Sequence, residues 1–153
     1  MVSPILIKKG DATRFYWNID ANVGAGSPNR NDDVQLVQLA YAIMATKPDT
    51  PAGDKAIYAL VRPGSPCTGL EADPLVRAIR AHQARRGGMQ DGHVSVIAAN
   101  SGIYPYGAGA VVFMLIALVN TIFDTMPANF PRLDKHKACP PALRASVVKA
   151  CTL

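Results

Sequence analysis

Apolar positions along the chain follow two different periods, which predict strands near the N-terminus and helices after them. Two short β-branched or aromatic runs, residues 4–9 and 13–20, are separated by the turn signal Lys9-Gly10-Asp11. This arrangement is typical of a β-hairpin. Residues 22–33 are rich in Gly, Asn and Asp, a composition that favours turns and supplies cap oxygens to a following helix.

The clearest helical period covers residues 33–46, where apolar side chains recur at spacings of three and four. The core positions predicted from this spacing are Leu36, Leu39, Ala40 and Ile43, widened by Val34, Val37, Tyr41 and Met44. A thin outward stripe is predicted at Gln35, Gln38 and Ala42. We expect Asn31, Asp32 and Asp33 to supply cap oxygens and negative charge at the positive end of this helix.

A second helix is predicted from Asp73, as N-cap, and Pro74, at the first helical position, to about Arg86. Its core face would hold Leu75, Ala78, Ile79 and His82, and Gly87-Gly88 would end it. The short apolar run 56–61 fits a helical turn or a strand equally well, because six residues do not define a period. Residues 93–98 predict a strand.

The most apolar segment, residues 108–126, predicts a buried helix that Pro127 stops. Its uninterrupted apolar stretch, residues 108–119, is shorter than the roughly 20 residues that cross a bilayer, so no transmembrane segment is predicted. A proline-rich connection and a short helix at about 141–151 complete the chain. The predicted fold class is α+β and mainly α, as a single domain over residues 1–153 with residues 97–153 as a C-terminal helical extension.

Two of these helical segments carry a family resemblance. Residues 32–44, DDVQLVQLAYAIM, and residues 75–94, LVRAIRAHQARRGGMQDGHV, resemble the first helix and the Ala-Val-x-x-Phe-Gln helix with its following Asp-Gly turn in the peptidoglycan-binding-like three-helix domain. The resemblance covers residues 30–96. The matching positions are Asp33, Val34, Val37, Gln38, Ala78, Ile79, Gln83, Asp91 and Gly92.

This chain departs from the family pattern at three places. His82 stands where the family usually has Phe, Leu75 stands where Thr is usual, and residues 68–72, TGLEA, keep only Gly69 of the usual Asp-Gly-x-Phe-Gly turn. The resemblance implies a helical core of bacterial or phage origin, a cell-wall ligand, and binding without catalysis. The partner would be peptidoglycan or a protein of the same assembly.

Composition narrows the class of protein. Apolar residues make up 49% of the chain and charged residues 18%, which indicates a globular domain and not a disordered one. The net charge is +5, but the basic segments contain no aromatic residue that could stack on a base, so no nucleic-acid partner is predicted. No export signal opens the chain. We expect a cytoplasmic origin, with delivery to the periplasm or to a secreted or virion assembly left open.

Candidate chemistry is sparse. Cys67 with His93 and Asp91 would supply the parts of a cysteine hydrolase, and a disulfide between Cys139 and Cys151 is open in an oxidising space. His136 with those two cysteines lacks a fourth zinc ligand, and Gly24-Ala25-Gly26 lacks the Lys of a phosphate loop. No cofactor and no metal are therefore predicted, and His82 is expected to be a packed structural histidine.

The predicted binding surface combines the outer side of the second helix, its Asp-Gly turn and two tyrosines that could meet a sugar or a protein. Its residues are Arg77, Arg80, Gln83, Asp91, His93, Tyr104 and Tyr106. The leading functional hypothesis is a non-catalytic binding module. The alternatives are a structural or adaptor protein of a phage tail or bacterial secretion assembly, for which a homo-oligomer stays open, and a small cysteine hydrolase.

Overall fold

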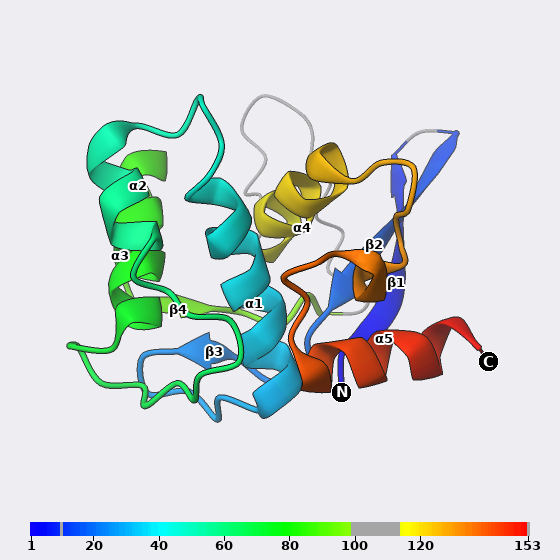
Figure 1. Ribbon diagram of the computed structural model, residues 1–153, viewed down its shortest axis with the longest axis horizontal. Helices are drawn as coiled ribbons and strands as arrows, with labels where there is room; N and C mark the ends of the chain where they lie inside the picture. The colour runs from blue at the N-terminus through cyan, green and yellow to red at the C-terminus, as the bar shows by residue number, and fades with distance from the viewer. Residues whose placement is uncertain (10, 99–113, 153) are drawn as a thin grey trace.

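The computed structural model describes residues 1–9, 11–98 and 114–152, which form an α+β fold dominated by helices (Figure 1). The helices are α1 (Asn31–Met44), α2 (Ala52–Tyr58), α3 (Pro74–Arg86), α4 (Met114–Thr125) and α5 (Pro141–Cys151), with the short 3-10 helix η1 at Leu133–Lys135. Four strands, β1 (Ser3–Lys9), β2 (Ala12–Asn18), β3 (Val23–Gly24) and β4 (His93–Val94), make two small antiparallel sheets.

The predicted N-terminal hairpin is confirmed. Strands β1 and β2 pair in antiparallel register, with Leu6 opposite Phe15 and Pro4 opposite Trp17. The base of the hairpin enters the core, where Tyr16 and Trp17 are fully buried. The indole Nε1 of Trp17 donates a hydrogen bond to the Pro131 carbonyl at 3.0 Å, so the hairpin is tied to the segment that follows α4.

The predicted strand 93–98 is much shorter in the structure, because β4 pairs with β3 only at His93 and Val94. Beyond Val94 two asparagine side chains replace a partner strand. The backbone N–H groups of Val96 and Ile97 donate to the Oδ1 atoms of Asn22 and Asn18, both at 3.0 Å. Because the side-chain amides accept these backbone N–H groups, no further strand pairing is required to satisfy them.

Helix α1 begins and ends two residues earlier than predicted, and its polar stripe is not outward. Gln35 and Gln38 are only 3% exposed, because the segments after α2 and before α5 cover them. Gln35 Oε1 accepts the backbone N–H of Leu143 at 2.9 Å. The expected negative charge is present in the first turn of α1, from Asp32 and Asp33, but the expected cap oxygens are not: the N-cap residue is Arg30, which makes no side-chain capping hydrogen bond.

The acidic side chains at the start of α1 bind other parts of the chain instead. The carboxylate of Asp33 accepts the backbone N–H groups of Asp20 and Ala21. The Oδ2 atom of Asp32 accepts the N–H of Val2 at 2.8 Å and the hydroxyl of Ser146 at 2.7 Å. These carboxylates therefore join α1 to the N-terminal segment and to α5.

Helix α3 has the predicted limits. The Oδ1 atom of Asp73 accepts the backbone N–H of Leu75 at 2.8 Å, and Pro74 occupies the first turn. Gly87 ends the helix in the left-handed conformation, with φ of 74°. This conformation is easily reached only by a residue without a Cβ atom. The run 56–61, whose type the pattern left open, contributes its first half to helix α2.

The predicted helix at residues 108–126 is described only from Met114 onward, and residues 108–113 lie outside the described residues. Helix α4 packs against α1 and β2, and α5 packs against α1 and β1. Residues 114–152 thus pack onto α1 and onto the N-terminal hairpin.

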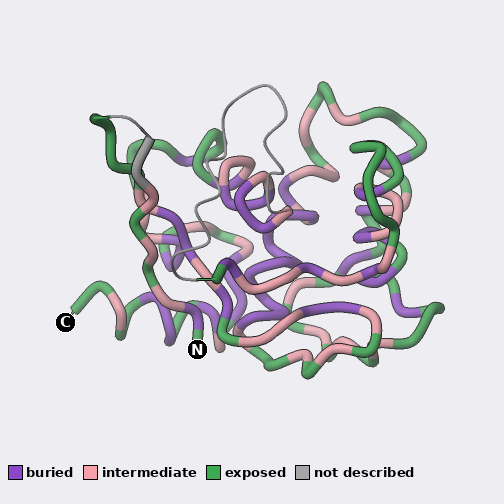
Figure 2. The backbone as a smooth tube through the Cα atoms, turned by 180° about the vertical axis from the view of Figure 1, so that it is seen from behind, coloured by how far each residue is buried: buried purple, intermediate pink, exposed green. Residues whose placement is uncertain are grey.

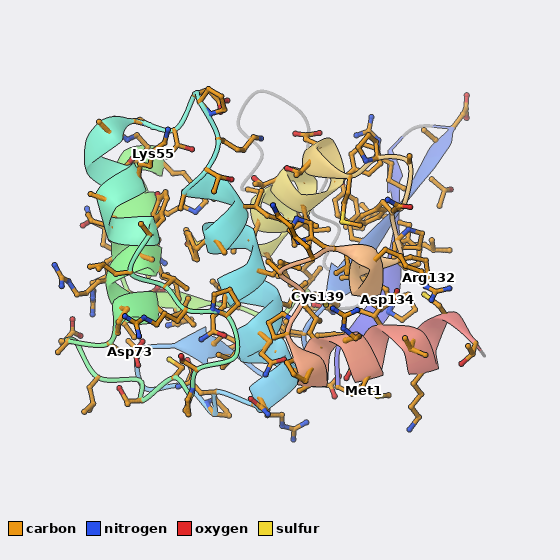
Figure 3. The ribbon with its side chains drawn as sticks, viewed as in Figure 1. Met1, Lys55, Asp73, Arg132, Asp134 and Cys139 are labelled. Atoms are coloured by element: carbon orange, nitrogen blue, oxygen red, sulfur yellow. The ribbon has the colours of Figure 1, made fainter. Side chains whose placement is uncertain are left out.

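Near the start of α5, Arg132 and Asp134 are joined by two hydrogen bonds of 2.7 and 2.8 Å and lie close to Cys139 (Figure 3).

One hydrophobic cluster extends from Val2 to Val147 and includes side chains from every helix. Figure 2 shows this interior as the buried inner turns of the helices, with exposed backbone at the loops and both ends. None of the described helices has both the length and the apolar character required to cross a membrane. All three cysteines carry free thiols, so Cys139 and Cys151 are not paired here.

Candidate functional site

Four of the seven predicted binding residues meet beside α3: Arg80, Gln83, Asp91 and His93. Gln83 is buried and holds the turn after α3 against the helix. Its Nε2 donates to Asp91 Oδ1 at 2.7 Å and to the His93 carbonyl at 3.1 Å, and its Oε1 accepts the Gly92 N–H at 2.9 Å. All its hydrogen-bonding capacity toward this turn is used, so Gln83 serves to position the Asp-Gly turn.

Arg80 is occupied by contacts within the protein. Its Nε and Nη2 atoms bind the two carboxylate oxygens of Glu71 at 2.9 and 2.6 Å, and its Nη1 donates to the Gln90 carbonyl. This paired geometry is the strong form of an arginine–carboxylate contact. Arg80 therefore bridges the segment before α3 and the segment after it.

The remaining predicted binding residues lie apart from this cluster or outside the described part of the chain. Arg77, one turn earlier on α3, is exposed. Tyr104 and Tyr106 belong to residues 99–113 and lie outside the described residues. Arg77 thus remains available to a ligand, whereas Arg80 and Gln83 are used to hold the fold.

The Asp91 and His93 side chains face each other, with 3.6 Å between Asp91 Oδ2 and His93 Nε2. Partial burial alone would raise the pKa of the Asp91 carboxyl, but hydrogen bonds from Gln83 and from the His93 backbone N–H outweigh it and hold the pKa below its usual value. Asp91 is therefore an ionised, structurally engaged carboxylate at neutral pH.

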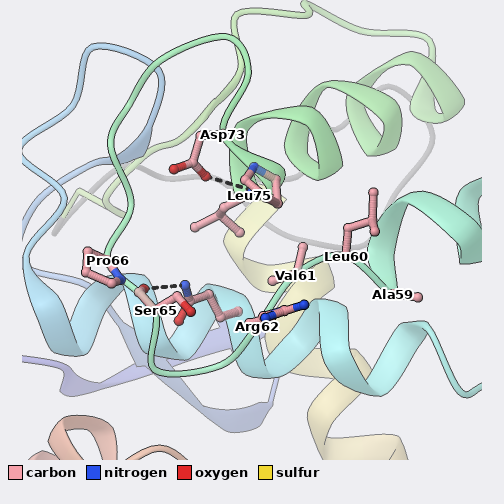
Figure 4. A pocket seen from close by; sticks show the side chains of 10 residues that line it. Ala59, Leu60, Val61, Arg62, Ser65, Pro66, Asp73 and Leu75 are labelled. Atoms are coloured by element: carbon pink, nitrogen blue, oxygen red, sulfur yellow. Dashed lines mark hydrogen bonds between the residues drawn. The ribbon is translucent and has the colours of Figure 1, made fainter.

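A groove of about 320 Å³ lies where the α2–α3 connection crosses α1 (Figure 4). We call it the α2–α3 groove. Its floor includes Gln38 of α1, whose Nε2 donates to the Ser65 carbonyl at 2.7 Å and whose Oε1 accepts the Gly64 N–H at 2.9 Å. Its walls are residues 59–62, 65–66 and 73–75. Gln38 therefore fixes the connection at the place where the groove forms.

The groove has an apolar wall with one charge of each sign. Leu60 is 53% exposed at its edge, and Arg62 is also exposed, while Asp73 and Leu75 enter from the start of α3 (Figure 4). Burial acts to raise the pKa of Asp73, but hydrogen bonds, above all from Thr68 and Leu75, outweigh it and keep the pKa below its usual value. The groove can therefore contact an apolar group, and a carboxylate at Arg62, whereas the Asp73 carboxylate is buried and is engaged by Thr68 and Leu75.

Cys67, the nucleophile of the hydrolase hypothesis, lies next to this groove. Burial and the neighbouring carboxylate of Asp73 raise the pKa of its thiol to about 11. A nucleophilic cysteine needs the opposite shift, since the thiolate is the reactive form. The carboxylate next to Cys67 is that of Asp73. The Asp91 carboxylate of the hydrolase hypothesis is hydrogen-bonded to Gln83 instead.

His82 is packed as predicted. Its Nδ1 atom lies 3.2 Å from the hydroxyl of Tyr41, and its ring stands edge-on to that of Tyr41 with 5.8 Å between centroids. Burial, with help from the charge of Arg86, lowers the pKa of His82 to about 4, so the ring is neutral at pH 7. The Arg85–Asp54 ion pair, 2.8 Å long, lines a smaller pocket of about 210 Å³ next to it.

The zinc alternative concerned His136, Cys139 and Cys151. His136 Nδ1 accepts the backbone N–H of Ala138 at 3.1 Å, Cys139 is buried and Cys151 is exposed. Over the described ranges, no group of three or more His, Cys, Asp or Glu side chains is arranged to hold a metal ion.

Sequence reasoning missed the α2–α3 groove. Its residues come from a stretch without a period, and the outward direction predicted for Gln38 concealed the floor. The available signal was the pair of prolines at 63 and 66 with Gly64 between them, which marks a connection that cannot be helical.

No family model, curated protein or solved structure matches this chain.

Proposed function

We propose that this chain is a non-catalytic binding module that holds a segment of peptidoglycan in the α2–α3 groove. The supporting observation is the groove itself, an open surface with an apolar wall and an exposed arginine, built on the two helices whose sequences resemble peptidoglycan-binding-like domains. Peptidoglycan offers this surface both sugar rings and short peptides with free carboxylates.

The arrangement of the two resembling segments supports this proposal. Helix α2 packs on both α1 and α3, and the turn after α3 pairs with β3 beside α1. The polar matches to the family, Gln38 and Gln83, hold connections in place. In this proposal both glutamines shape the binding surface, Gln38 at the floor of the groove and Gln83 at the turn after α3.

Retention on purified cell-wall sacculi tests the proposal. We expect the wild-type protein to be retained, and Arg62→Ala and Leu60→Ser each to lower retention several-fold, because they remove the cation and the apolar edge of the groove. Lys149→Ala, an exposed charge on α5, is the matched control for nonspecific attraction of a basic protein and should not change retention.

Arg77→Ala separates the groove from the outer side of α3. A loss of retention in this variant alone would move the site to α3. Retention no greater than that of an unrelated protein with the same net charge would remove the cell-wall ligand altogether.

A structural or adaptor role is the second candidate, supported by large apolar side chains that are exposed away from the groove, such as Leu6 at 67% and Phe123 at 43%. Size-exclusion chromatography with light scattering tests the self-association form of this role. A stable oligomer would favour it, and a monomer at all concentrations would count against it.

A further inference from the structure

A second hollow lies between strand β2 and helix α4, on the side of the molecule away from α2 and α3 (Figure 1). Its volume is about 340 Å³. We call it the aromatic pocket. Its walls include Phe15 of β2, Val119 and Phe123 of α4, and Phe130 of the following segment, with Arg14 and Asn120 as polar members.

The rings of the aromatic pocket are held by one another. Phe130 stands edge-on to Phe15, with 5.8 Å between centroids, and edge-on to Phe123, with 5.3 Å. Phe15 in turn stands edge-on to the buried Trp17 at 5.3 Å. Such edge-to-face contacts are favourable, so the pocket is formed before any ligand arrives, and little has to be ordered when a ligand binds.

Apolar surface continues beyond the pocket. Phe123 is 43% exposed at its mouth. Leu6 is directly opposite Phe15 in the hairpin, so the two side chains share one face of the sheet, and Leu6 is 67% exposed. Burying such side chains on binding is favourable, and a preformed pocket beside them is suited to one inserted apolar anchor.

The charge at the pocket indicates which charge a partner segment should carry. Arg14 is the one charged residue among those that line the pocket, and it is exposed. An arginine beside aromatic rings favours a carboxylate and repels a cation that the ring faces would otherwise attract. The chain as a whole carries a net charge of +5, which acts in the same direction.

From this geometry we propose that the aromatic pocket is a docking site for an extended segment of a partner protein, which inserts one large apolar side chain and places acidic residues near Arg14. The site is separate from the α2–α3 groove, and the proposal does not rest on the cell-wall ligand. The module can therefore hold a second protein while its groove is occupied.

Trp17 provides a built-in reporter, because it is the only tryptophan of the chain and contacts a ring of the pocket wall. The full-length protein is titrated with three acetylated, amidated tripeptides: phenylalanine between two glutamates, phenylalanine between two lysines, and alanine between two glutamates. We expect a saturable change in Trp17 emission with the first peptide. Binding should be at least tenfold weaker with the second peptide and absent with the third.

Two variants locate the binding. Phe123→Ala opens the pocket mouth and should weaken binding of the acidic phenylalanine peptide at least tenfold. Arg14→Gln should weaken it several-fold and remove the preference over the lysine peptide. The matched controls are Leu70→Ala, an exposed leucine before α3, and Arg77→Gln, an exposed arginine on α3, and both should bind as the wild type does. Circular dichroism and the melting temperature establish that each variant is folded.

Three outcomes would overturn the proposal. The first is no emission change with any peptide at millimolar concentration. The second is equal binding of the acidic and basic phenylalanine peptides, which would remove the charge argument. The third is Phe123-dependent binding to anionic phospholipid vesicles without peptide binding, which would assign the pocket to a membrane surface.

Discussion

Single buried polar residues, above all Gln83 and Gln38, determine where the connections of this chain lie. Each accepts one backbone N–H and donates to a carbonyl or carboxylate on a neighbouring segment. A buried amide that loses such partners leaves unsatisfied groups behind, each at about 1–3 kcal/mol.

Replacing Gln83 should therefore loosen the turn that follows α3. We expect Gln83→Ala to lower the free energy of unfolding by about 2–3 kcal/mol, because the Gly92 N–H and the Asp91 carboxylate lose their common partner. Urea denaturation measures this change. Gln90→Ala, an exposed glutamine of the same turn, should stay within about 0.5 kcal/mol; equal effects of the two would show that Gln83 carries no special role.

His82 should make stability depend on pH. Its pKa is about 4 in the folded protein against an ordinary 6.5, so the unfolded chain binds the proton more readily. The stabilisation is complete above pH 6.5 and is lost as the pH falls toward 4, by about 1–2 kcal/mol between pH 7 and pH 5. Unfolding free energies measured across this window should show this slope.

Two histidine variants isolate that effect. In His82→Phe the slope between pH 7 and pH 5 should be smaller, because no proton can bind at this position in either state. His82→Gln, which also removes the titrating ring, should reduce the slope to the same extent. A wild-type slope in His82→Phe would assign the pH dependence to other groups.

At the scale of elements, the backbones of β3 and of the turn after α3 come close together at Gly24. Gly24 has φ of 116°, and a Cβ atom added there would lie 2.2 Å from the Gly92 carbonyl oxygen. We expect Gly24→Ala to destabilise the protein by more than about 2 kcal/mol, through this overlap and the unfavourable φ together.

Gly53 of α2 is the matched control for that substitution. No atom lies within 4 Å of a Cβ built there, so Gly53→Ala should be neutral or stabilise the helix by roughly 0.5–1 kcal/mol. Thermal unfolding of both variants gives the comparison. Similar melting temperatures for the two would mean that the β3–β4 contact tolerates a side chain.

Elements with strong local signals were predictable from the sequence. The limits of α3 follow from Asp73, Pro74 and Gly87, because capping is a local property of the chain. Strand 93–98 failed because its N–H groups bind Asn18 and Asn22, far away in sequence. The same holds for the outward stripe of α1, since Gln35 is covered by the start of α5, and periodicity cannot reveal what covers a polar side chain.

The candidate site likewise has a part that could be predicted from the sequence and a part that could not. The Arg80–Gln83–Asp91 grouping was predictable, because helix spacing and a following turn bring these residues together. The α2–α3 groove and the aromatic pocket were not, because each combines segments far apart in the chain, such as β2 with α4. Their residues carry no motif, and only the packing of the whole chain reveals them.

For the whole molecule, the shared core predicts one cooperative unit. Leu143 of α5 is fully buried in the same cluster as the residues of α1 and α3. We expect Leu143→Ala to cost about 3 kcal/mol and to shift the urea transitions of Trp17 emission and of helical circular dichroism together.

Val148→Ala, also on α5 but 39% exposed, should change stability by less than about 0.5 kcal/mol. Two separated transitions in the wild type, with only one moved by Leu143→Ala, would mean that residues 97–153 fold independently of residues 30–96.

The paired hydrogen bonds of Gln38 have one more consequence. They anchor residues 64 and 65 to a helix whose interior side is buried in the core, so this stretch of loop is held in place by the helix beneath it. A ligand that binds against residues 64 and 65 therefore contacts a surface that already has its final conformation. The association rate of such a ligand should be limited by diffusional encounter and not by a conformational change of the protein.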